Sequence, residues 1–74
     1  MKTHWQKQTE QRTESIDISD GQVFVGTDEG FGHGCSGVAA SCSEFLAGKL
    51  NELVESKFGS EVLGEVRAAA SGAA

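Results

Sequence analysis

The sequence has few of the residues that stabilise a small protein through covalent, metal or membrane contacts. Its 74 residues include only two cysteines, Cys35 and Cys42, which can form one disulfide at most, and His and Cys do not recur at the spacing of a closed zinc site. No apolar run approaches the roughly 20 residues that span a bilayer. The segment Met1–Trp5 also lacks the apolar core of a signal peptide. We therefore expect a cytoplasmic protein with reduced thiols, no cofactor and no membrane contact.

Basic residues are also scarce. Six Lys and Arg stand against 11 Asp and Glu, which gives a formal net charge of −5. Lys2, Lys7 and Arg12 make the first 14 residues slightly basic, so the excess of acid falls on residues 15–74. Phosphate backbones are bound by clustered Lys and Arg, so direct nucleic-acid binding is not expected. An acidic surface suits a basic protein partner, including one that itself binds nucleic acid.

The short length limits the core that the chain can bury. A domain of this size removes only about 60% of its unfolded surface from water. Apolar residues make up 38% of the sequence, which favours a folded chain over a disordered one. Because no disulfide framework is available, we expect self-association to supply additional stability.

The clearest structural signal is a β-hairpin over about residues 14–26. Asp20-Gly21 separates two alternating runs, and this dipeptide is typical of a type I′ turn because both turn positions need positive φ. The register then places four apolar side chains on one face, namely Ile16, Ile18, Val23 and Val25. Phe24 lies on the other face beside Asp17, where it is a candidate contact for a partner.

A long amphipathic helix is predicted over about residues 37–58. At 100° per residue one side is apolar, with Cys42, Phe45, Leu46, Leu50, Leu53 and Val54. The opposite side carries Glu44, Gly48, Asn51, Glu52 and Glu55. Lys57 in the last turn and Gly59 after it are expected C-terminal signals.

This helix could begin at either of two N-cap residues. Ser36 could cap it, which would separate Cys35 and Cys42 by about 10 Å of helical rise. Alternatively, Ser41 and Glu44 match a capping box, and the loop before them could bring the two thiols together.

The remaining segments extend this unit. Residues 1–13 are polar and are expected to form a mobile tail or an edge strand whose Trp5 docks on the core or on a second subunit. A shorter helix is predicted over about residues 61–70. The expected architecture is thus a single α+β domain over residues 14–74, with the hairpin packed on the helices.

The stretch Gly30–Gly37 holds the candidate chemistry. Gly32 to Gly37 match G-x-G-x-x-G, but the predicted strand ends too early and two acids precede the glycines, so a flexible connector is favoured over phosphate binding. His33, Cys35 and Cys42 could ligate a metal, or His33 could activate a Cys35 thiolate. A fourth ligand and a third catalytic group are missing, and Cys42 on the apolar side suits a small buried residue.

Several parts follow one another over about residues 16–50, namely Asp20-Gly21, Gly30-Phe31, Gly34, Cys35 and the helix with Phe45 and Leu46. This order of segments resembles that of a small bacterial family of unknown function. The resemblance implies a ββα outline and no particular activity.

The favoured function is a non-enzymatic protein-interaction module, such as a small acidic accessory or inhibitor protein of bacterial or phage type. Docking on a basic partner would use an acidic surface of Glu44, Glu52, Glu55, Asp28 and Glu29, with Trp5 and Phe24 as further contacts. Two alternatives stay open. One is a thiol or metal site at His33, Cys35 and Cys42, and the other is a structural homo-oligomer whose interface contains Trp5 and apolar surface of the hairpin.

Overall fold

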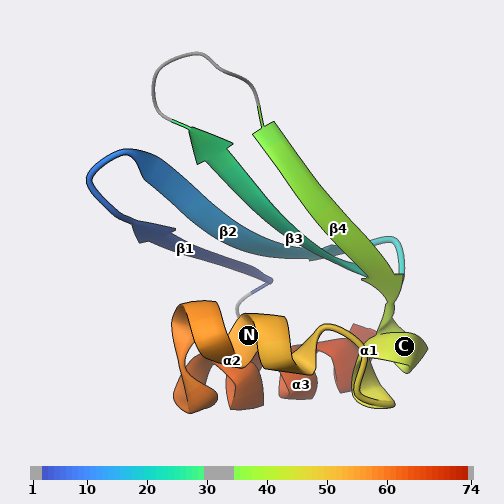
Figure 1. The fold of residues 1–74 in the computed structure, drawn as a ribbon. Helices are drawn as coiled ribbons and strands as arrows, with labels where there is room; N and C mark the ends of the chain where they lie inside the picture. The colour runs from blue at the N-terminus through green and yellow to red at the C-terminus, as the bar shows by residue number, and fades with distance from the viewer. Residues whose placement is uncertain (1–2, 30–34, 74) are drawn as a thin grey trace.

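Four antiparallel strands form one sheet, and three helices cover one of its faces in the part of the chain that the computed structural model describes, residues 3–29 and 35–73 (Figure 1). The strands are β1 (His4–Gln8), β2 (Arg12–Ser19), β3 (Gln22–Glu29) and β4 (Cys35–Ser41). They lie in the order β1-β2-β3-β4, so each pairs with its neighbour in sequence. The helices are α1 (Cys42–Leu46), α2 (Asn51–Phe58) and α3 (Ser60–Ala73). The α+β class is confirmed.

The hairpin has the predicted turn and register. Asp20 and Gly21 both have positive φ, 53° and 73°. Ile18 pairs with Val23, and Ile16 with Val25. All four side chains are buried on the face that the helices cover. The ladder extends beyond the predicted limits, from Arg12 to Glu29, because both strands gain a second neighbour in β1 and β4.

The predicted helix over residues 37–58 is wrong in its first part, because Cys35–Ser41 forms strand β4. Ser36, Val38, Ala40 and Cys42 also fit the period of two that a strand requires, so the local pattern is ambiguous. Pairing with β3 along seven residues decides in favour of the strand, since it satisfies a ladder of backbone groups at once.

The rest of the predicted helix is divided by a turn at residues 47–50. Gly48 and Leu50 have φ of 117° and 67°, which no α-helix permits. Gly48 N donates to Phe45 O and Lys49 N donates to Glu44 O, both at 3.0 Å, in the pattern of a Schellman cap. Gly48 therefore ends α1 rather than occupying the polar side of a longer helix.

Helices α2 and α3 are joined at Gly59. Its φ is 94°, and its N–H donates to Glu55 O at 2.8 Å, which confirms the predicted end of the second helical segment. The C-terminal helix is also confirmed, and it begins at Ser60 and continues to Ala73, beyond the predicted limit at residue 70. None of the helices over residues 42–73 is long and apolar enough to cross a membrane.

The core lies between the sheet and the helices. Its largest fully buried side chains are Phe45, Ile16, Val23, Val54, Val66 and Cys42. Ala69 and Ala70 of α3 are buried too, and their small side chains let this helix pack closely. Glu14 of β2 is buried as well, and its Oε2 lies 3.1 Å from Lys57 Nζ of α2, which ties the two layers together.

Of the two alternatives for residues 1–13, the structure shows an edge strand at His4–Gln8. Trp5 pairs with Ile16 and is buried on the helix-covered face. Its Nε1 donates to Glu65 Oε1 of α3 at 3.0 Å. Lys7 Nζ donates to Lys57 O at 3.0 Å, which attaches the strand to the end of α2. Trp5 thus anchors β1 to the core of its own chain.

Candidate functional site

Strand β4 forms one edge of the sheet and pairs on one side with β3 (Figure 1). In the described part of the chain, no further strand pairs with its other side. Its seven residues, Cys-Ser-Gly-Val-Ala-Ala-Ser, include no charge and no proline. Natural sheets usually protect an exposed edge with lysine, proline, a bulge or a covering element. The opposite edge has such protection in part, since β1 is shorter and carries Lys7.

The register shows which backbone groups of β4 point away from the sheet. A two-residue turn makes Ser19 and Gln22 a hydrogen-bonded pair, and such pairs then alternate along the hairpin. Val23 and Val25 therefore direct their backbone groups toward β4, where they meet Ala40 and Val38. The residues between these, Gly37 and Ala39, direct their N–H and C=O groups outward.

An open groove of about 330 Å³ runs beside this edge on the helix-covered face. It is lined by Val25, Thr27, Ser36, Gly37, Val38, Leu53 and Lys57. Val38 is 46% exposed, whereas Val25, its pairing partner on β3, is 3% exposed. The edge thus combines free backbone groups with an apolar contact surface, the two features that added strands use for affinity and specificity.

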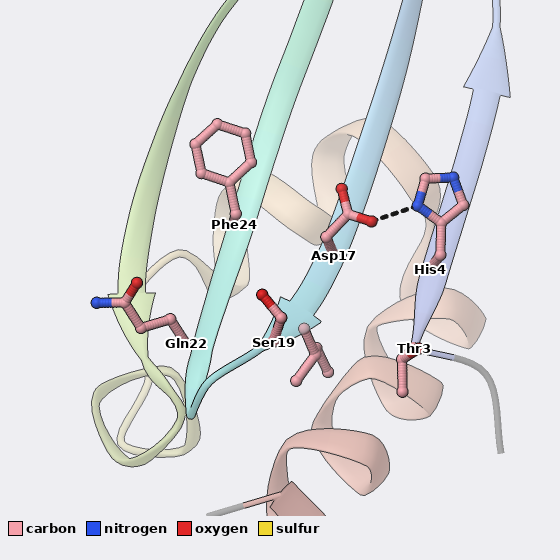
Figure 2. A pocket seen from close by; sticks show the side chains of 7 residues that line it. Thr3, His4, Asp17, Ser19, Gln22 and Phe24 are labelled. Atoms are coloured by element: carbon pink, nitrogen blue, oxygen red, sulfur yellow. Dashed lines mark hydrogen bonds and ion pairs between the residues drawn. The ribbon is translucent and has the colours of Figure 1, made fainter.

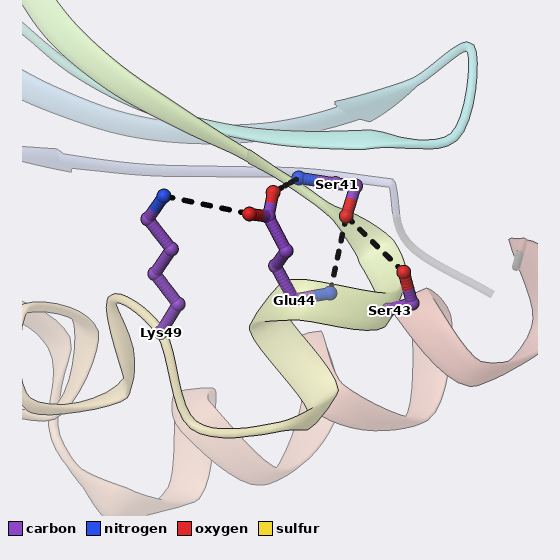
Figure 3. Close-up of polar contacts among 4 residues, drawn as sticks. All are labelled: Ser41, Ser43, Glu44 and Lys49. Atoms are coloured by element: carbon purple, nitrogen blue, oxygen red, sulfur yellow. Dashed lines mark hydrogen bonds and ion pairs between the residues drawn. The ribbon is translucent and has the colours of Figure 1, made fainter.

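The C-terminal end of the edge is closed by a capping box (Figure 3). Ser41 N donates to Glu44 Oε1 at 2.9 Å, and Glu44 N donates to Ser41 Oγ at 3.1 Å. The donation from Ser41 N, together with the Ser41 side chain and Lys49, holds the pKa of Glu44 below its usual value. Because Ser41 N is occupied, the outward groups of Gly37 and Ala39 remain for a partner.

The uncovered face of the sheet carries a hollow of about 470 Å³ near the start of β1 (Figure 2). His4 and Asp17 point toward each other across β1 and β2, and His4 Nδ1 is bonded to Asp17 Oδ1. This bond raises the pKa of His4. The hollow is open and lies on a polar sheet face, as is usual where one side of an antiparallel sheet meets water.

Phe24 lies on this face and packs on the backbone of the sheet. Its ring lies over two glycines that are paired across β3 and β4, so a Cβ at Gly26 would come 2.7 Å from Phe24 Cε1 and one at Gly37 would come 2.5 Å from Phe24 Cζ. The ring remains 44% exposed. Aromatic side chains stabilise glycine in sheets in this way.

The residues of the predicted acidic surface lie on different elements, with Asp28 on β3, Glu44 on α1, and Glu52 and Glu55 on α2. Glu44 belongs to the capping box and lies 3.6 Å from Lys49 Nζ, while Glu52 and Glu55 are exposed on α2. Asp28 follows Phe24 at the strand period and lies on the uncovered face of the sheet, opposite the helices. For Glu29 the structure describes the backbone, as the last residue of β3.

The structure separates the two cysteines. Cys35 begins the extended strand β4 and Cys42 follows its last residue, so seven steps with a rise of about 3.3 Å each put their Cα atoms roughly 23 Å apart. This separation excludes both a disulfide and a shared metal ion within one chain. Cys42 is a free thiol buried in the core. His33 lies outside the described residues, among which no three His, Cys, Asp or Glu are placed to hold a metal.

The glycine motif does not precede a helix. Gly37 lies inside β4, and the next helix starts at Cys42. The helix N-terminus that would bind a phosphate next to the glycines is therefore missing. The other residues of the motif before Cys35 lie outside the described part of the chain.

Comparisons with protein-family models, with curated proteins and with solved structures find no match to this chain. The resemblance to a ββα family therefore stays a prediction.

Reasoning from sequence missed the edge of β4 and the contact between His4 and Asp17. The period-two pattern from Ser36 to Cys42 was a signal for the strand. The second contact had no local signal, because its partners are 13 residues apart and meet only through the register of β1 with β2.

Proposed function

We propose that the chain is a non-enzymatic protein-interaction module that binds an extended segment along the free edge of β4. The observation that carries this proposal is the uncharged edge itself, seven residues long, beside an apolar groove. Gly37 and Ala39 offer two donors and two acceptors. Val38 and Leu53 offer the apolar contact. Strand addition of this kind binds partners through backbone hydrogen bonds and reads their alternate side chains.

The edge also defines the chemistry of the bound segment. A strand antiparallel to β4 places every second side chain over the groove, where an aliphatic or β-branched residue can contact Val38 and Leu53. Its other side chains lie beside Gly37 and Ala39, where small residues fit. A charge over the groove would lose hydration next to Val38 and Leu53, and Lys57 at the groove is already paired with Glu14, so an uncharged segment is expected.

The test is a selection of short random peptides on immobilised protein, followed by NMR mapping of the bound site. Bound peptides should shift the amide signals of Gly37 and Ala39. Ala39→Pro removes one outward N–H at an edge position where proline is tolerated, and it should abolish binding. Ala39→Ser is the matched control and should retain it. Failure to select any peptide, or equal binding to the proline variant, would reject the proposed edge.

A second candidate surface is the exposed side of the helices, which would dock on a basic partner. Two cations of the helical layer, Lys57 and Arg67, contact other parts of the fold, and this favours the helices as a docking surface. Lys57 pairs with the buried Glu14, and Arg67 donates to Leu46 O at 2.9 Å and to the side chain of Asn51. Their charges are thus used inside the fold, which leaves exposed carboxylates at Glu52, Glu55 and Glu61. Such a surface would accelerate encounter with a positively charged protein.

A further inference from the structure

We infer that the segment bound along β4 is the β4 strand of a second copy of this chain, so that two sheets join into one across a twofold axis at Val38. This inference rests on the proposed function of the edge and names its occupant. The symmetry is the isologous arrangement of most homodimers, in which the same patch of both copies forms the interface.

The backbone of β4 is self-complementary about Val38. In an antiparallel pair centred there, Gly37 lies opposite Ala39 of the second copy, and Ala39 lies opposite Gly37 of the second copy. Both residues direct their N–H and C=O groups outward, so the two pairs form four hydrogen bonds. Val38 then faces Val38 of the second copy in a non-hydrogen-bonded pair, where side chains approach most closely.

The side chains fit the same register. Val38 is the exposed apolar residue of the edge, and the pair buries it from both copies at the rim of the groove. Gly37 and Ala39 have no bulk that would keep the strands apart. At the end of the strand, Glu44 already accepts Ser41 N, which limits the contact to the central residues. The strand thus meets the requirement for an uncharged partner with small residues and one β-branched side chain.

Charge gives the dimer a distinctive salt response. Each copy carries a formal net charge of −5, whereas the contact strand carries none. Added salt screens the repulsion between copies and leaves the hydrogen bonds and the valine contact in place. Dimerisation should therefore strengthen with salt, which is the opposite of docking between an acidic and a basic surface.

A charge-swap experiment tests the axis directly. Val38→Lys and Val38→Glu each place like charges opposite one another across the twofold axis and remove the valine contact. Each variant alone should dimerise more weakly than the unmodified protein by roughly tenfold or more in sedimentation equilibrium. When the two variants are mixed, opposite charges face each other, and a mixed dimer should recover part of the lost affinity. Circular dichroism tests whether each variant is folded. Ala39→Pro serves as a second variant that blocks the edge.

The outcomes separate this inference from the proposed function. A dimer in which the amides of Gly37 and Ala39 become protected from hydrogen exchange, and which the charge swap restores, supports it. A monomer at high concentration overturns it, as does a dimer that Ala39→Pro leaves intact or a mixture that is no tighter than either variant. If a monomer still binds selected peptides at this edge, the self-association is rejected and the proposed function stands.

Discussion

The hydrogen bond between His4 and Asp17 on the surface of the sheet makes a contribution to stability that depends on pH. The hydrogen bond to Asp17, with smaller contributions from Gln6 and the charge of Asp17, raises the pKa of His4 above the usual value of 6.5. A raised pKa means that the protonated imidazole is favoured in the folded state. The stabilisation is complete below pH 6.5 and is lost as the pH rises through the raised pKa.

NMR titration of the imidazole protons should therefore give His4 a midpoint above 6.5. In Asp17→Asn the midpoint should fall back toward the usual value, because both the acceptor charge and the ion pair are lost. The chain has a second histidine, so His33→Gln assigns the signals. An unchanged midpoint in Asp17→Asn would contradict the contact.

The two glycines under Phe24 determine how strand β4 lies against β3. At Gly37 a Cβ would meet Phe24 Cζ at 2.5 Å and also Val25 O at 2.6 Å, which belongs to the backbone and cannot rotate away. At Gly26 the close contact, at 2.7 Å, is with the Phe24 ring, and the next atoms are at 3.5 Å. The two positions should therefore respond differently when the ring is removed.

We expect Gly37→Ala to lower the free energy of unfolding by about 1–3 kcal/mol, because it overpacks a site bounded by backbone. Gly26→Ala should destabilise when Phe24 is present and should be largely tolerated in a Phe24→Ala background. Urea unfolding of the single and double variants gives the coupling energies. If Phe24→Ala rescued both alanines equally, the backbone contact at Gly37 would be refuted.

At the scale of elements, local signals set the ends of the helices. The capping box of Ser41 and Glu44 marks the start of α1, and Gly48 and Gly59 mark the ends of α1 and α2. Each signal depends on backbone conformation within a few residues. The sequence predicts Gly59 as a helix end and the capping box as one of two starts, whereas it places Gly48 within a longer helix. Arg67 adds a contact that is not local, since it bonds to carbonyl oxygens at the end of α1 from 21 and 22 residues away.

Across the whole molecule, two basic side chains of the helical layer contact other parts of the fold, whereas several acidic side chains of the same layer are exposed. Internal contacts use Lys57 and Arg67, whereas Glu52 and Glu55 remain exposed. If this surface docks a basic protein, binding should weaken as salt increases, and the double variant Glu52→Lys and Glu55→Lys should weaken it further. Fluorescence anisotropy against a model basic protein such as a histone measures both effects.

The control for this surface is Asp28→Lys, which reverses one charge on the opposite face of the sheet and is compared with the single variants Glu52→Lys and Glu55→Lys. It should affect binding less than the helix variants do. Salt-independent binding, or an equal loss from Asp28→Lys, would count against a defined acidic surface on α2. The same salt series separates this docking from the dimer, which should strengthen rather than weaken.

Local patterns were enough to predict the α+β class, the hairpin turn and register, the end of α2 at Gly59 and the presence of a C-terminal helix. These features depend on the conformation of residues close together in the chain, such as Asp20 and Gly21 with their positive φ values. The buried side of the hairpin followed from the same register, because side chains alternate strictly along a strand.

Contacts between distant segments were needed to establish that residues 35–41 form a strand, that Trp5 is buried, and that the acidic residues lie on different elements. The segment Ser36–Cys42 fits a helix and a strand about equally, and its pairing with β3 resolves the choice. Trp5 is placed by β2 and by Glu65, 60 residues away. The free edge of β4 exists because of this pairing, so the candidate site is a property of the fold that no local pattern specifies.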